Sequence, residues 1–237
     1  MIFFRVSDRY LKYNYRSQRY VQRNIKDFLR VKNLIADSRY VAEEALEIGF
    51  EFMPKVIYPP FSEYLKGGLD RKECRKKLNL PMDKILLLSV ASDDPRKNLK
   101  AVKETVNQLG TKYALVHVGP KMDGAYNFIN ISESEINEVY NACDVLLFPS
   151  LDEGFGFPLV EAMATGLPVV SSLIDVVSEV CGNAAILVEP EPRKLASGVI
   201  DAISNRELYI SRGYARSQIF TTERFHSELL NFYKTIR

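Results

Sequence analysis

Short apolar runs alternate with amphipathic stretches along the sequence from about Ile85 onward. Each run has the length of one strand, and the stretches between them have the length and spacing of helices. Runs that are apolar without interruption are typical of parallel strands covered on both faces. The pattern therefore predicts an α/β fold with a Rossmann-like parallel sheet flanked by helices.

Helix-capping and helix-ending residues between these runs support the prediction. Ser132 with Glu135 forms a capping box, and Pro158 and Gly166 suit the first position and the end of one helix. The expected strands cover residues 85–90, 114–118, 144–149, 167–171 and 184–188. The expected helices cover residues 98–109, 132–142, 158–165 and 194–204.

The first 80 residues follow a different pattern. A strand over 34–38, a helix over 39–48 and a strand over 55–58 give too few strands for an independent sheet core. Gly67-Gly68 and a charge-rich run indicate an interdomain linker near residues 61–77. We therefore expect a small, incomplete N-terminal α/β portion with its linker over 1–65 and the main domain over 66–237.

Composition limits the classes of function. The net charge of +2 comes from 32 basic and 30 acidic residues, so the average balance requires neither nucleic acid nor an acidic partner. The three cysteines are widely spaced and form no cluster that could hold zinc, which favours a reducing, cytoplasmic setting. No apolar run approaches the roughly 20 residues that a membrane-spanning helix needs.

A basic stretch runs from Arg5 to Lys32, with nine Lys or Arg residues against two Asp residues. Apolar residues at helical spacing within it would allow peripheral contact with an anionic membrane. Because a charge run is usually a solvated surface, we favour a helix that packs against further protein with its basic face in water.

The segment from Pro149 to Ala162 carries two carboxylates, Glu153 and Glu161, eight positions apart around a Gly-x-Gly turn. A glycine turn that opens a helix lets backbone amides approach an anion or sugar hydroxyls. A carboxylate near a helix start also stabilises the helix dipole, which explains either glutamate alone. The strand, glycines, proline and paired glutamates together favour a binding site.

A second candidate segment runs from Ser89 to Asn98, where a strand leads through a loop into a helix. The adjacent cations Arg96 and Lys97 could neutralise a diphosphate at the carboxyl edge of the sheet. They could equally form the solvated start of a helix. Adjacent Asp93 and Asp94 are expected to serve as turn and capping residues rather than as metal ligands.

The segment 149–162 resembles the E-x7-E signature of the retaining family called glycosyl transferases group 1, which includes bacterial mannosyltransferases and enzymes like sucrose-phosphate synthase. Segments 166–171, 178–185 and 188–190 keep the family's order, and the resemblance covers roughly Leu34 to the C-terminus. It implies the two-Rossmann-domain architecture (GT-B), represented here by the C-terminal donor-binding domain and a truncated N-terminal domain. The acceptor site would then belong to the part that is missing.

The resemblance also implies roles for individual residues. It makes Glu153 and Lys97 catalytic, the carboxylate at the donor sugar and the lysine at the leaving diphosphate. Donor binding would use Arg96, Gly119, Gly154, Phe155, Gly156, Phe157 and Glu161, with Glu161 on the ribose and the loop at Gly119, together with residues 128–131, around the base. Many family members carry a Gly-Arg pair where this chain has Ala91-Ser92, which puts one phosphate contact in doubt.

The expected function is transfer of a hexose from UDP- or GDP-hexose to a sugar, lipid or protein acceptor, with retention of configuration. Neither a cofactor nor a metal is expected. One alternative is a non-catalytic nucleotide-sugar-binding subunit that requires a partner chain. Another is an epimerase or phosphorylase on the same plan, of which a phosphorylase would need a pyridoxal-phosphate lysine.

Overall fold

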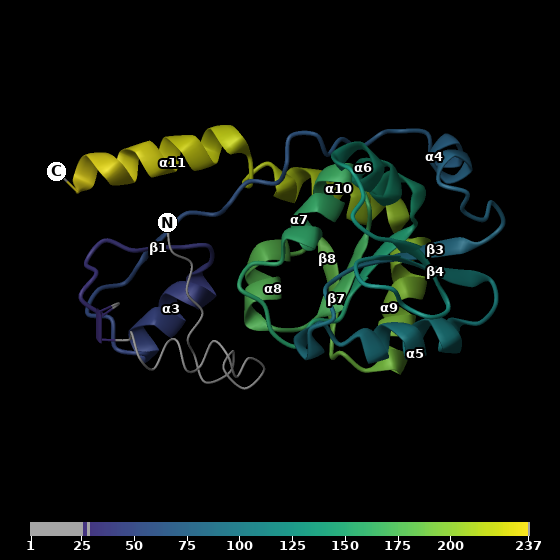
Figure 1. The fold of residues 1–237 in the computed structure, drawn as a ribbon, viewed down its shortest axis with the longest axis horizontal. Coiled ribbons are helices and arrows are strands. Elements are labelled where there is room, and N and C mark those ends of the chain that lie inside the picture. The colour runs from purple at the N-terminus through teal and green to yellow at the C-terminus, as the bar shows by residue number, and fades with distance from the viewer. Residues whose placement is uncertain (1–25, 28, 237) are drawn as a thin grey trace.

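The computed structural model describes residues 26–27 and 29–236. The amphipathic pattern of the basic N-terminal stretch lies largely outside the described residues, and both interpretations of it remain predictions. Figure 1 shows a large α/β body and, beside it, a smaller N-terminal portion that contains β1 and α3.

The large body is built on a six-stranded, fully parallel sheet in the order β5-β4-β3-β6-β7-β8. Its strands are β3 (Ile85–Val90), β4 (Tyr113–Val118), β5 (Ala125–Phe128), β6 (Val145–Phe148), β7 (Val169–Ser172) and β8 (Ala185–Val188). The parallel sheet predicted from the apolar runs is confirmed. The edge strand β5 was not predicted, because its partly exposed sequence Ala-Tyr-Asn-Phe lacks a continuous apolar run.

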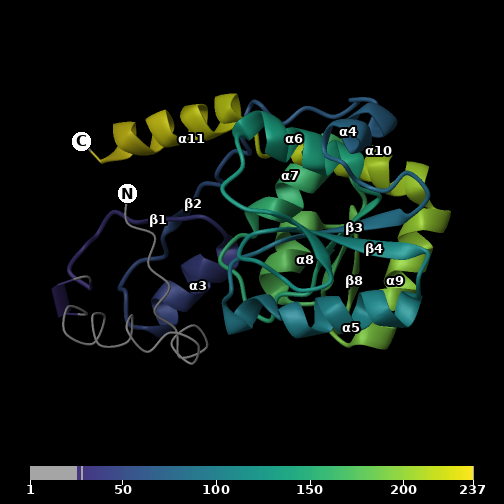
Figure 2. The ribbon, with the colours of Figure 1, turned by 45° about the vertical axis from the view of Figure 1, so that its right-hand side comes forward.

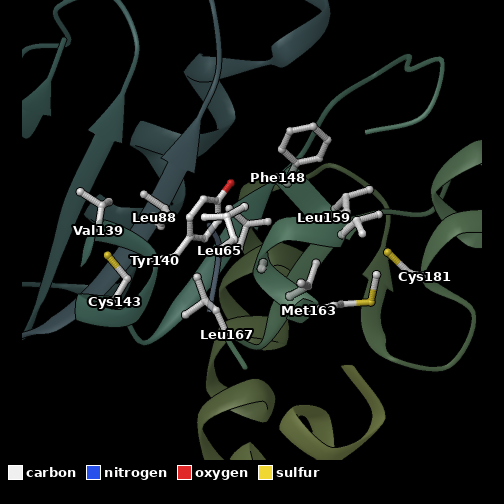
Figure 3. Packing of buried hydrophobic residues seen from close by; sticks show 14 of the residues in the cluster. Leu65, Leu88, Val139, Tyr140, Cys143, Phe148, Leu159, Met163, Leu167 and Cys181 are labelled. Atoms are coloured by element: carbon white, nitrogen blue, oxygen red, sulfur yellow. The ribbon is translucent and has the colours of Figure 1, made fainter. Parts of the chain in front are cut away.

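Alternate residues of each strand serve two separate cores. On β3, Leu86 and Leu88 belong to one buried cluster and Leu87 to the other, and all three are fully buried. The cluster with Leu87 is covered by α5 (Leu99–Leu109) and α9 (Pro192–Ser204). The opposite cluster, shown in Figure 3, is covered by α6 (Glu133–Ala142), α7 (Phe157–Thr165) and α8 (Asp175–Cys181).

The helix boundaries follow the predicted signals. Ser132 caps α6 by accepting from the Glu135 amide, and the Glu135 side chain accepts from the Ser132 amide. This capping box is as predicted. Pro158 lies in the first turn of α7, and Gly166 is its C-cap.

The expected linker over residues 61–77 is wrong in its second half, which forms α4 (Arg71–Lys77). The charged run is helical because Asp70 caps it and Cys74 and Arg75 are buried against the large body. Arg75 donates to the Ala142 carbonyl on α6, so α4 is part of the large body.

The N-terminal portion pairs β1 (Ile35–Ala36) with β2 (Lys55–Val56) and adds α3 (Arg39–Glu47). Among its described residues, the buried hydrophobic cluster consists of Ala36, Val41 and Ala42. The two strands are shorter than expected, in keeping with a sheet too small to stand alone.

The C-terminal region continues with α10 (Arg206–Ser217), which packs on α7, and α11 (Thr222–Thr235). Figures 1 and 2 show α11 extending away from the sheet on the side of the N-terminal portion. In the described part of the chain, no helix has the length and apolar character needed to cross a membrane.

Candidate functional site

The strand order creates a topological switch point between β3 and β6. Chain connections leave β3 toward β4 on one side and β6 toward β7 on the other. Open α/β sheets bind ligands outside the carboxyl ends of strands at such a point. The two segments that follow these strands are the 3-10 turn Pro95–Lys97 and residues 149–156, which are the segments singled out by their sequence.

The two predicted catalytic side chains meet at this point. Lys97 Nζ lies 2.6 Å from Glu153 Oε1, and the side chains are only 16% and 8% exposed. The ammonium also lies 5.3 Å from the ring centroid of Phe148, the last residue of β6. Positive and negative charge are therefore held together, largely out of water, at the edge where a ligand would bind.

Arg96 fastens the two segments together. Its guanidinium donates to Asp94 at 3.0 Å and to the Asp152 carbonyl at 3.1 Å, while the Leu151 amide donates to the Arg96 carbonyl. Burial alone would raise the pKa of Asp94, but the Arg96 amide and guanidinium hold that pKa below its ordinary value. The prediction that Asp94 is a capping residue is confirmed.

The glycine turn precedes α7 as expected, and its residues differ in which of their groups can contact a ligand. Gly156 is the N-cap with φ 88°, and a Cβ there would lie 2.7 Å from Leu159 Cδ1. Phe157 is exposed, whereas the Phe155 ring is buried and lies edge-on to Phe220. Phe155 can therefore contact a ligand only through its backbone.

Glu161 lies on α7 behind the glycine turn, and its carboxylate has a partner that was not predicted. The hydroxyl of Tyr140, on α6, donates to Glu161 Oε2 at 2.5 Å. Burial raises the pKa of Glu161, and the hydrogen bond from Tyr140 offsets part of that rise. Burial and the adjacent carboxylate raise the pKa of Tyr140 well above its ordinary value, so the phenol acts as a donor.

Gly119 ends β4 at the same edge. Its φ is 148°, and a Cβ there would lie 2.1 Å from the Ala91 carbonyl oxygen, so only glycine fits between the ends of β3 and β4. Its amide donates to the Phe128 carbonyl. His117, two residues earlier, is fully buried in β4, and burial lowers its pKa.

The N-terminal portion also reaches this edge. Ser38, the N-cap of α3, donates its hydroxyl to the Gly154 carbonyl at 2.7 Å. On α8, Glu179 accepts from the Arg39 and Tyr40 amides and from the Tyr58 hydroxyl at 2.8 Å. The capping role of Ser38 is readable from sequence, but its contact across 116 positions is not.

A parallel sheet in this strand order, with a glycine turn and paired charges at its switch point, defines an α/β domain of Rossmann type. A model of the family "Glycosyl transferases group 1" matches residues 70–216. The chain belongs to this family, as the sequence motifs suggested.

Two curated relatives illustrate the likeness. The chain is 31% identical over 148 residues to O-antigen chain mannosyltransferase RfbU of Salmonella typhimurium, covering 53% of this chain and 42% of that protein. It is 24% identical over 173 residues to O-antigen chain mannosyltransferase B of Escherichia coli, covering 63% and 45%. The chain thus spans less than half the length of these relatives.

Solved structures share the architecture. Anabaena Alr3699/HepE, in complex with UDP and glucose, superposes with a TM-score of 0.82 at 20% identity, over 92% of this chain and 67% of that one. Sucrose-phosphate synthase from Thermosynechococcus elongatus gives 0.75 at 23% identity, over 87% and 59%. These likenesses confirm the α/β fold with its parallel sheet.

Proposed function

We propose that this chain binds a nucleoside diphosphate hexose and supplies the donor half of a retaining hexosyl transfer. The observation that carries the proposal is the 2.6 Å Lys97–Glu153 pair at the switch point between β3 and β6. HepE, solved with UDP and glucose, and RfbU, a mannosyltransferase, support a UDP- or GDP-linked hexose as donor.

In this proposal the ion pair opens when the donor arrives. Lys97 moves from Glu153 to the diphosphate and, with the amides at Gly154–Phe157, stabilises the charge that develops on the leaving group. Arg96 stays engaged with Asp94 and Asp152, which keeps the turn that carries Lys97 fixed against the loop that carries Glu153.

Glu153, released from Lys97, would accept hydrogen bonds from the donor sugar and stabilise positive charge at its anomeric carbon. Glu161 would hold the ribose, and the loop at Gly119 would contact the base. The proposal needs no metal or cofactor, since cations and amides of the chain take the charge of the leaving diphosphate. A lipid-linked acceptor would place the protein in the cytoplasm at the membrane periphery.

Calorimetric titration with UDP, GDP and their hexose conjugates tests the donor site. We expect saturable binding to one diphosphate, weakened about tenfold or more in Glu161→Ala, because a hydrogen bond to a charged group contributes ~1.5–3 kcal/mol. Lys100→Ala, which removes an exposed lysine on α5, is the control and should bind as the wild type does. A folded wild type that binds none of these compounds would contradict the proposal.

A second candidate is a nucleotide-sugar-binding module that requires a partner chain for transfer. The observation that favours it is the smallness of the second sheet, in which β1 and β2 have two residues each. Binding of the hexose conjugate without release of free diphosphate, with or without simple sugar acceptors, would favour this candidate. Release of diphosphate that depends on Lys97 and Glu153 would favour the transferase.

A further inference from the structure

Tyr140 belongs to the buried core beside β3 and β6, and its hydroxyl bonds to Glu161, a residue of the predicted nucleotide site. The Tyr140 side chain is 1% exposed, and its ring packs with Leu88 and other residues of the core cluster. In Figure 3 its hydroxyl oxygen points to the side of Phe148, at the carboxyl end of β6. A buried tyrosine hydroxyl requires a hydrogen-bond partner, and the structure provides Glu161.

This contact determines how the Glu161 carboxylate can be used. Tyr140 donates to Oε2 from the side of α6, and among the described residues no second group bonds to the carboxylate. Oε1 is thus the acceptor that remains for a ligand. A glutamate has three side-chain torsions, so a fixed hydrogen bond on one oxygen restricts where the other oxygen lies.

Fixing that oxygen matters for recognition of a diol. A site in which a carboxylate already stands in the bonding position pays less ordering entropy when the ligand binds. A site built to bond a hydroxyl also rejects the analogue that lacks the hydroxyl, because a buried acceptor is then left unpaired. Both effects depend on the carboxylate being held in place.

We propose that Tyr140 is a positioning residue that holds Glu161 with one oxygen directed at the ribose diol, so that the domain selects ribonucleotides over their deoxy analogues. The inference rests on the proposed function, since it assumes that Glu161 meets the ribose. It assigns a role to a core residue that has no contact with the ligand itself.

Tyr140→Phe is the direct test, because it keeps the ring in the core and removes only the hydroxyl. We would titrate wild type and variant with the preferred ribonucleoside diphosphate and with its 2′-deoxy and 2′,3′-dideoxy analogues. The wild type is expected to prefer the ribose form by about tenfold or more, and the variant is expected to lose most of that preference.

The pH dependence of nucleotide affinity provides a second measurement, which would not change if Tyr140 had a purely structural role. The hydrogen bond from Tyr140 lowers the pKa of Glu161, so its removal raises that pKa further above the ordinary value of 4.5. Binding that needs the ionised carboxylate is lost as pH falls through this pKa. The acid limb of the affinity profile is therefore expected to move to higher pH in Tyr140→Phe.

Tyr209→Phe provides a matched control. Tyr209 on α10 also donates its hydroxyl to a carboxylate, Asp201 Oδ2 at 3.3 Å, away from the switch point. Its replacement should leave both the ribose preference and the acid limb unchanged. Glu161→Gln serves as a second variant: it should lose the ribose preference by itself, and adding Tyr140→Phe to it should cause no further loss.

The possible outcomes distinguish a failure of the Tyr140 inference from a failure of the proposed function. A wild type that binds no nucleoside diphosphate overturns the proposed function and this inference together. A wild type that binds, with a Tyr140→Phe variant of unchanged ribose preference and unchanged acid limb, overturns the inference alone. Additive losses from Tyr140→Phe and Glu161→Gln would also overturn it.

Discussion

Strand β6 has a carboxylate paired with a cation at each end, and the two differ in how many partners they have. Asp144, at the amino end, accepts from Arg71 at 3.0 Å, from Arg75 at 2.6 Å and from the Leu86 amide at 2.7 Å. Glu153, beyond the carboxyl end, forms its ion pair with Lys97 alone among the described residues, at 2.6 Å.

The cations differ in the same way. Arg75 also donates to the carbonyls of Ala142 and Lys84, so its guanidinium is held in place by three groups besides packing. Lys97 is a single ammonium on a flexible chain with one hydrogen bond to Glu153. We conclude that the Asp144 cluster joins α4 to the sheet, whereas the Lys97–Glu153 pair can exchange a protein partner for a ligand.

The largest expected effect comes from Asp144→Ala, which leaves two arginines without their carboxylate. Removing one partner of a buried ion pair leaves the other charge buried and uncompensated. The free energy of unfolding should therefore fall by about 3–5 kcal/mol. Chemical denaturation measures this loss, with the exposed Asp83→Ala as control. Nucleotide affinity of the folded protein should not change, and a change would contradict the structural role.

Lys97→Met is expected to lower stability less, by about 1–3 kcal/mol, and to weaken nucleoside diphosphate binding about ten- to hundredfold. Adding Glu153→Gln should restore stability, since both charges are then gone, without restoring affinity. Denaturation and calorimetry on the single and double variants check this. Recovery of affinity in the double variant would break the distinction drawn between the two ends of β6.

Glu179→Gln sharpens the comparison with a third carboxylate. Like Asp144, Glu179 accepts hydrogen bonds from three donors. One donor is the Tyr58 hydroxyl, whose pKa is raised to about 12 by burial and by the hydrogen bond to Glu179. The variant should lower stability by about 1–2 kcal/mol and speed hydrogen exchange of the first α3 amides. If Glu179→Gln weakened nucleotide binding as much as Lys97→Met is expected to, the number of hydrogen-bond partners would not distinguish structural carboxylates from ligand-binding ones.

The smallest expected effect concerns Asp94, whose pKa is held below its ordinary value of 3.8. A depressed carboxyl pKa stabilises the fold above the unfolded-state pKa, and this contribution is lost as pH falls through the folded-state value. Asp94→Asn should therefore be less stable than the wild type near pH 6, and the difference should disappear in strong acid. A difference that grew toward low pH would contradict the assignment.

The elements that sequence predicted well are those whose signals are local. Uninterrupted apolar runs marked β3, β4, β6, β7 and β8, and Ser132 and Gly166 marked helix ends. The misses have a physical reason. The edge strand β5 has one exposed residue among four, so its sequence is not an uninterrupted apolar run. Helix α4 lies on the surface and is rich in charged residues, and such a sequence looks the same as that of a charged linker.

The sequence predicted that the two candidate segments lie at one edge of the sheet, but it did not predict the contacts between them. Lys97 and Glu153 were expected at one edge, and the sheet order brings them to 2.6 Å. Phe155 was expected to offer its backbone amide to the ligand, and its ring packs in the core against Phe220. The contacts of Tyr140 and Glu179 had no sequence signal, because their partners lie on other elements.

The sequence by itself determined the parallel sheet, the glycine turn and the family of this protein, because each depends on spacing within a few neighbouring residues. The tertiary structure decided which charges are satisfied and which remain exchangeable. Asp144 and Glu153 are both carboxylates beside β6, and although the glycine turn marks Glu153 as a site candidate, the sequence does not show how many partners each carboxylate has. The difference lies in the helices and strands that pack around each, which the chain brings together only by folding.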